Sequence, residues 1–131
     1  NCEHTAGVQA DLRGPMIRQA DQTGAFTWYV GGSRRLAEIA ADAYRSFGVV
    51  TYAQPERGAG GEMSPFFRLA PSLQLLQGGV YFHSDHDTLD TVPYTGLAAS
   101  TRAYAKIIDE VNQLDLGDMQ RSAAVGQAPG R

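Results

Sequence analysis

The spacing of apolar residues predicts an amphipathic helix over residues 33–47. Ser33 is a suitable N-cap, and Gly48 is a suitable residue just beyond the C-terminus. Between them, apolar side chains recur at the i, i+3, i+4 and i+7 spacing of one helix face: Leu36, Ile39, Ala40, Ala43 and Phe47. Charged residues fall on the other side: Arg34, Glu38, Asp42 and Arg45. We therefore expect one side of this helix to be buried.

A second, longer helix is predicted over about residues 93–114. Its apolar face carries Leu97, Thr101, Tyr104, Ile108 and Val111, and its polar face carries Arg102, Lys106, Asp109 and Glu110. A short helix is also expected over residues 64–70, with Ser64 as N-cap and Pro65 at the first helical position.

Four stretches between turn-forming residues are rich in apolar or β-branched side chains and predict strands. They lie at residues 5–14, 24–32, 49–53 and 71–79. The second could instead be a hydrophobic loop in a binding cleft. Because strands alternate with helices, the class is α/β, with a mixed, largely parallel sheet flanked by helices.

Composition limits the partners. The chain has 131 residues, which suits one domain, and a net charge of −3. Lys and Arg form no cluster, so nucleic acid is not an expected partner. The single cysteine, Cys2, allows neither an internal disulfide nor a cysteine-based zinc site. No apolar run approaches the roughly 20 residues that span a bilayer, so no membrane segment is expected.

The two ends of the sequence predict an incomplete N-terminus and a flexible C-terminal tail. The chain begins without methionine and enters a strand-like segment almost at once. It is therefore expected to be a piece of a longer protein, or alternatively to have a trimmed or mature N-terminus. Residues 116–131 have no hydrophobic period and predict a flexible tail.

The stretch "YFHSDHDTLDTVPYTGL", residues 81–97, holds the main candidate chemistry. His83 follows a predicted strand and is a candidate metal ligand, and Asp85 or Asp87 could accept a hydrogen bond from its imidazole. Asp87, Thr88, Asp90 and Thr91 could cap the helix that follows. The alternative is a solvated loop whose Asp and Thr residues only cap that helix. His86 is either a further ligand or a solvent-exposed side chain.

A second candidate ligand lies far upstream. Asp11 comes at the end of the first predicted strand, and His83 comes just past the last one. In α/β sheets, sites form beyond the carboxyl ends of the strands. The two side chains are therefore expected at the same edge of the sheet, provided that their strands are near neighbours.

Together these segments resemble the C-terminal part of the M28 family of zinc peptidases. The family motif, roughly Tyr-His-Thr-x-x-Asp-Thr-x-Asp before a long helix, corresponds to Phe82–Asp90 followed by Gly96 and Leu97. Its upstream Asn-Leu-Asp-Met-x-Gly strand corresponds to "VQADLRG", with Asp11 as the match. The separation, 83 − 11 = 72 positions, is typical of the family. The family's central Asp-His pair is absent, and Glu62 is only an approximate substitute.

The resemblance implies a zinc-exopeptidase-like partial domain in residues 1–115. It implies two Zn²⁺ ions per complete site, with Asp11 binding one ion and His83 the other. Asp87 and Thr88 would support the ligands, and His86 and Glu62 are possible additional ones. The remaining ligands and the general base would come from the rest of the same peptidase domain, upstream of this chain. The substrate would be a peptide or aminoacyl compound, the chain alone would be inactive, and a secreted or periplasmic location is favoured.

Two other functions remain open from the sequence. One is a non-catalytic relative of the same fold that acts as a binding or scaffold domain. The other is an unrelated metal hydrolase that uses His83, His86 and Asp87 as a local ligand group.

Overall fold

The computed structural model describes residues 7–13, 16–53, 60–67 and 69–119. Its strands are β1 (Val8–Arg13), β2 (Met16–Thr23), β3 (Phe26–Gly31), β4 (Thr51–Ala53) and β5 (Ser72–Leu76). Its α-helices are α1 (Arg34–Ser46) and α2 (Tyr94–Val111), and two short 3-10 helices lie at η1 (Gly61–Met63) and η2 (Leu89–Thr91). The α/β class predicted from the sequence is confirmed.

The strands of the described residues form two sheets. β3 lies between β4 and β5, and pairs parallel with β4 and antiparallel with β5. β1 and β2 form a separate antiparallel hairpin. The larger sheet is therefore mixed, as predicted, with one parallel pair among the described strands.

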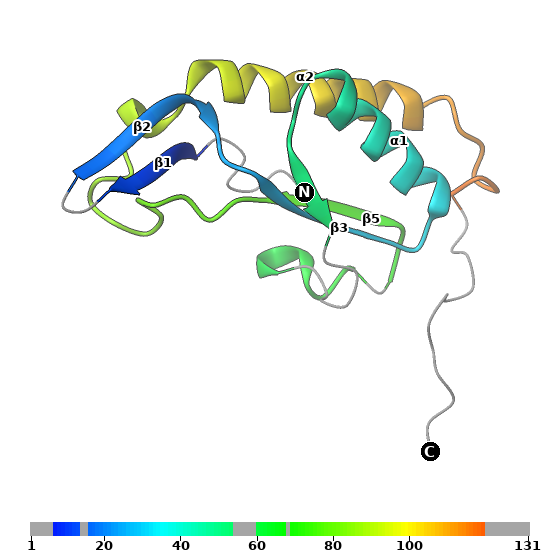
Figure 1. Cartoon of the computed structure of the whole chain (residues 1–131). Helices are drawn as coiled ribbons and strands as arrows, with labels where there is room; N and C mark the ends of the chain where they lie inside the picture. The colour runs from blue at the N-terminus through cyan, green and yellow to red at the C-terminus, as the bar shows by residue number, and fades with distance from the viewer. Residues whose placement is uncertain (1–6, 14–15, 54–59, 68, 120–131) are drawn as a thin grey trace.

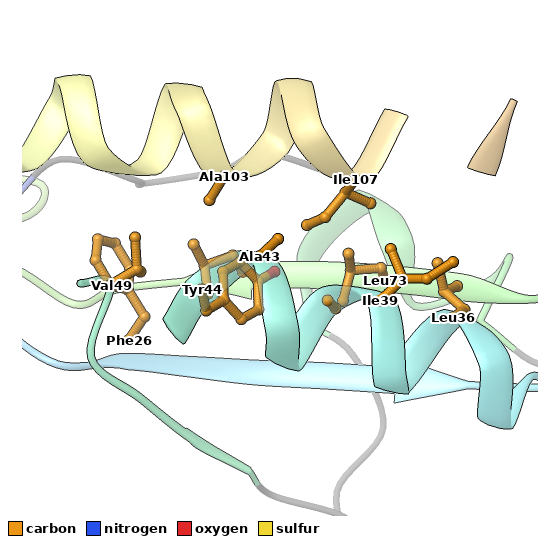
Figure 2. Packing of buried hydrophobic residues seen from close by; sticks show 11 residues of the cluster. Phe26, Leu36, Ile39, Ala43, Tyr44, Val49, Leu73, Ala103 and Ile107 are labelled. Carbon is orange, nitrogen blue, oxygen red and sulfur yellow. The ribbon is translucent and has the colours of Figure 1, made fainter. Parts of the chain in front are cut away.

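Both α-helices cover the same face of the three-stranded sheet (Figure 1). Ala103 and Ile107 of α2 point toward α1 and the sheet, where Tyr44 and Leu73 lie (Figure 2). Phe26 and Leu75, from the sheet, are fully buried. The aromatic strand β3 thus belongs to the core, and Trp28 packs edge-on against Tyr44 with ring centroids 5.9 Å apart.

Helix α1 forms for the reasons visible in the sequence. The hydroxyl of Ser33 accepts a 3.2 Å hydrogen bond from the Leu36 backbone N–H and so caps the helix. Gly48, just beyond the helix, adopts a φ of 70°, which glycine tolerates without strain. On the polar side, Lys106 of α2 contacts Asp42 of α1 at 3.3 Å, which links the two helices.

One strand was not predicted, and one predicted helix was wrong. Residues 16–23 form β2, although their mostly polar sequence gave no strand pattern. The helix expected from Ser64 does not extend, because Ser64 ends the 3-10 helix Gly61–Met63 and residues 64–67 form turns. No residue of that 3-10 helix is buried, so little packing is available to stabilise a longer helix here.

A buried glutamine fixes the segment that leads into that 3-10 helix. Gln74 of β5 is 0% exposed, and its amide group meets the backbone of Gly60 at two points. The Gly60 N–H donates to Gln74 Oε1 at 3.1 Å, and Gln74 Nε2 donates to the Gly60 carbonyl at 3.2 Å. This side chain satisfies backbone groups that a neighbouring strand would otherwise pair.

The predicted flexible tail, residues 116–131, lies mostly outside the described residues. None of the helices in the described ranges combines the length and the apolar character that crossing a bilayer requires.

Candidate functional site

The loop between β5 and α2 carries most of the candidate site residues, and hydrogen bonds between near neighbours shape it. The backbone carbonyl of Tyr81 accepts from both the N–H and the hydroxyl of Ser84, at 3.0 and 2.7 Å. The Ser84 hydroxyl in turn accepts from the His86 N–H at 3.3 Å. The Asp87 N–H then donates to the Ser84 carbonyl at 3.0 Å. A compact series of turns therefore replaces regular secondary structure here.

His83 lies at the tip of the first turn. Its φ of 59° makes it the single non-glycine residue with positive φ in the described part of the chain. The imidazole is exposed and stacks on the ring of Phe82, with centroids 3.8 Å apart and an interplanar angle of 21°. A left-handed backbone is unfavourable for side chains with a Cβ and is found often at functional sites.

The four other candidates in and beyond the loop are also exposed: Glu62, His86, Asp87 and Thr88. The His86 ring lies edge-on to Tyr81, with centroids 6.4 Å apart. Thr88 precedes η2, and its backbone carbonyl accepts from the Thr91 hydroxyl at 2.7 Å. Glu62 lies in η1, a different segment.

The expected helix capping does not occur. Pro93 holds the N-cap position of α2, and no side chain caps either α2 or η2. The hydroxyl of Thr91 bonds to a carbonyl of its own turn instead. The polar residues of the loop therefore stabilise the loop itself rather than the start of α2.

The β1–β2 hairpin lies against this loop. Gln19 of β2 donates a 2.8 Å side-chain hydrogen bond to the Tyr81 hydroxyl. At the start of β1, a Cβ on Gly7 would lie 3.3 Å from the Cα of Gly79, so the two backbones are in close contact. Asp11 is inside β1, opposite Arg18, and the neighbouring residue Ala10 faces Gln19 in the hairpin.

The two ligand candidates therefore lie on neighbouring segments, but not in the predicted way. Asp11 belongs to the hairpin, whereas the strand before His83 belongs to the three-stranded sheet. A shared edge of one sheet therefore does not bring them together. The contacts of Tyr81 and Gly79 with the hairpin bring the segments together instead.

The start of α2 is fixed to the same hairpin. A Cβ on Gly96 would lie 2.2 Å from the Thr23 Cγ2 atom, so glycine alone allows this approach. The Thr95 hydroxyl donates a hydrogen bond to the carbonyl of Asp21. Sequence reasoning missed Gln19 and Thr95, because isolated polar residues outside a motif give no sign of a long-range partner.

The loop also borders a pocket of about 150 Å³. Its lining residues include Gly7, Gln77, Gly79, Asp87 and Val92. Sequence reasoning missed Gln77, whose side chain is only 6% exposed.

Within the described ranges, no three His, Cys, Asp or Glu side chains lie close enough together to hold one metal ion. His83, His86 and Asp87 are all described, and they do not form such a group in this arrangement. Comparisons with protein-family models, with curated proteins and with solved structures found no match for this chain.

Proposed function

We propose that this chain is the C-terminal part of an M28-like metallopeptidase that uses two zinc ions to hydrolyse peptide bonds. In this proposal Asp11 binds one ion and His83 the other. The observation that carries it is the contact between the two segments, through the 2.8 Å hydrogen bond from Gln19 to Tyr81. Segments far apart in the sequence, each holding one residue of the resemblance, adjoin in space.

The local geometry of His83 supports its role as a ligand. The side chain is exposed, so an ion can reach it, and the Phe82 ring at 3.8 Å restricts the plane of the imidazole. The turn bonds around Ser84 restrict the loop. Such restriction lowers the entropy lost when a ligand side chain binds an ion. Asp87 and Thr88 are the residues that would orient and support this loop during binding.

The donors present fit part of such a site. A protein zinc ion takes at least three protein ligands in ordinary sites, and the described residues hold no such group. The other ligands and the general base would therefore come from the remainder of the same domain. When bound, zinc would supply Lewis-acid polarisation of the peptide carbonyl. His86 and Glu62 remain possible additional ligands.

The same proposal extends to the fold. We infer a zinc-exopeptidase-like domain in which further strands make the sheet largely parallel. β4 lies at one edge of the three-stranded sheet, and Val50 and Tyr52 at this edge are 65% and 50% exposed. An edge of this kind supports pairing with further strands.

The alternative is a non-catalytic relative that acts as a binding or scaffold domain. The specific observation in its favour is the lack of a three-ligand group within the described residues. A scaffold domain can be distinguished from the peptidase by experiment, because it is expected neither to contain zinc nor to hydrolyse a substrate.

The test compares wild type, His83→Ala and His86→Ala in the natural polypeptide that carries this sequence. Zinc content and release of a chromophore from aminoacyl substrates are measured, with circular dichroism to monitor folding. We expect His83→Ala to abolish turnover and lower zinc content while the fold persists. His86→Ala tests whether the second exposed histidine of the loop is an additional ligand, since unchanged turnover and zinc content in this variant would exclude that role. Full activity in His83→Ala would remove this residue from the mechanism, and a wild type without zinc or turnover would favour the scaffold alternative.

A further inference from the structure

The turn that carries His83 runs from Tyr81 to Ser84 and is closed by a 3.0 Å hydrogen bond from the Ser84 N–H to the Tyr81 carbonyl. His83 is the third residue of this turn and has a φ of 59°, whereas the φ of Phe82, the second residue, is not positive. This is the pattern of a type II turn, in which the third position favours glycine. An imidazole therefore occupies a position where the backbone alone favours glycine, and such departures from local preference concentrate at functional sites.

The hydroxyl of Ser84 makes two further hydrogen bonds that hold this conformation. It donates to the Tyr81 carbonyl at 2.7 Å, so this carbonyl accepts two hydrogen bonds from one residue. It also accepts a 3.3 Å hydrogen bond from the His86 N–H. Ser84 is exposed, so it contributes to the loop through these bonds rather than through packing. One side-chain oxygen thus fixes the backbone on both sides of His83.

The conformation of the turn also determines where the imidazole lies. The His83 ring stacks on the ring of Phe82, its neighbour in the turn, with centroids 3.8 Å apart and 21° between the ring planes. In an extended backbone, adjacent side chains point to opposite faces and cannot stack in this way. The stack therefore requires the turn, and it provides a measure of the turn conformation in solution.

We propose that Ser84 is a positioning residue for His83, because its hydroxyl keeps His83 in the left-handed turn and so holds the stacked imidazole in one orientation for a metal ion. The role toward the ion rests on the proposed function, in which His83 binds zinc, whereas the role in the turn does not. A ligand side chain that is already held in place loses less conformational entropy on binding. Loss of the Ser84 hydroxyl should therefore weaken zinc binding without removing a ligand.

The first test measures the NMR shifts of the His83 imidazole protons in the full chain with EDTA present. The Phe82 ring current shifts these protons, and Phe82→Ala gives the unstacked reference. Ser84→Ala removes the hydroxyl and Ser84→Thr retains it. Thr91→Val is the matched control, because the Thr91 hydroxyl donates a 2.7 Å hydrogen bond to a carbonyl three residues earlier in the same loop, as the Ser84 hydroxyl does.

We expect Ser84→Ala to lose most of the ring-current shift of the His83 protons. Ser84→Thr and Thr91→Val should keep it, since both retain the bonds around His83. An unchanged shift in Ser84→Ala would overturn the proposal, whether or not the protein binds zinc.

The second test measures zinc affinity in the natural polypeptide that carries this sequence, by competition with a chromophoric chelator and with circular dichroism to monitor folding. Ser84→Ala should bind zinc about five-fold more weakly, as the loss of one hydrogen bond implies, and Ser84→Thr and Thr91→Val should match the wild type. Equal affinity of wild type and Ser84→Ala would overturn the positioning role and leave the peptidase proposal intact. A wild type that binds no zinc would overturn the peptidase proposal and the role of Ser84 toward the ion, and the role in the turn would then be decided by the His83 shifts.

Discussion

The side-chain amide of Gln19, in β2, donates a 2.8 Å hydrogen bond to the hydroxyl of Tyr81, in the loop before α2. This contact joins the hairpin that contains Asp11 to the turn that contains His83. The position of the Asp11 segment relative to the His83 segment therefore depends in part on the Gln19–Tyr81 hydrogen bond, in which neither candidate ligand takes part.

A double-mutant cycle on this pair should detect the bond. Tyr81→Phe removes the hydroxyl, and Gln19→Met removes the amide with little change in length. We expect a coupling free energy of about 0.5–1 kcal/mol, at the low end for hydrogen bonds because the pair is exposed. Urea unfolding of the wild type, both single variants and the double variant measures it. Strictly additive effects would show that the bond contributes nothing to stability.

Replacement of His83 by glycine and by alanine should have different effects on stability. Glycine adopts a φ of 59° without the Cβ repulsion that alanine retains. We expect His83→Gly to unfold with a free energy about 1 kcal/mol higher than that of His83→Ala, as measured by urea denaturation. If the two variants were equally stable, the backbone of this turn would not be strained. Both variants lack the imidazole, so neither should support turnover in the proposed enzyme.

Gly96→Ala should destabilise the protein strongly. The added Cβ would lie 2.2 Å from Cγ2 and 2.8 Å from the backbone nitrogen of Thr23, and a backbone atom cannot move aside cheaply. We expect a loss of about 2–3 kcal/mol or more in the free energy of unfolding. Gly117→Ala is the control, because nothing lies within 4 Å of the added atom, and it should be neutral to within about 0.5 kcal/mol. If Gly96→Ala unfolded thermally at the same temperature as the wild type, the prediction would be wrong, and α2 would be able to shift away from the hairpin.

The link between α1 and α2 should weaken at high pH. Hydrogen bonds from the Lys106 ammonium to Glu110, and then to Asp42, raise the pKa of this lysine above 10.5. A raised pKa in the folded state means that the contribution to stability is complete below pH 10.5 and is lost as pH rises through the folded-state value.

The difference in urea midpoint between wild type and Lys106→Met measures this contribution. We expect it to be constant from about pH 7 to about pH 9 and to shrink as pH rises past the ordinary lysine value. Arg102→Met, an exposed position on the same helix, is the control and should show no such decline, because arginine stays charged. A difference that grows with pH would contradict the sign of the effect.

The amphipathic parts of the fold could be predicted from the sequence. Ser33, the apolar spacing from Leu36 onward and Gly48 define α1, because each acts through neighbours on the same helix. Strand β2 could not be predicted in this way. Its polar residues gain their strand conformation from pairing with β1, which is a tertiary effect that local preference does not reveal.

The sequence was sufficient to predict that the candidate site lies in a loop. It was not sufficient to predict which distant residues contact that loop. The letters around His83 indicated a polar, turn-rich segment, and the structure has one. The long-range contacts of Gln19 and Gln77 depend on how two sheets meet, and no periodic pattern encodes that. The hairpin that contains Asp11 meets the loop through Gln19 and Tyr81, and not through a common sheet.

The amide of Gln74 is a single side chain that serves in place of part of a strand. It supplies one acceptor and one donor to Gly60, as a residue of an adjacent strand would. The position of the segment at Gly60 therefore depends on one side chain. A substitution of Gln74 would remove both hydrogen bonds to this segment, as the loss of a paired residue in an adjacent strand would.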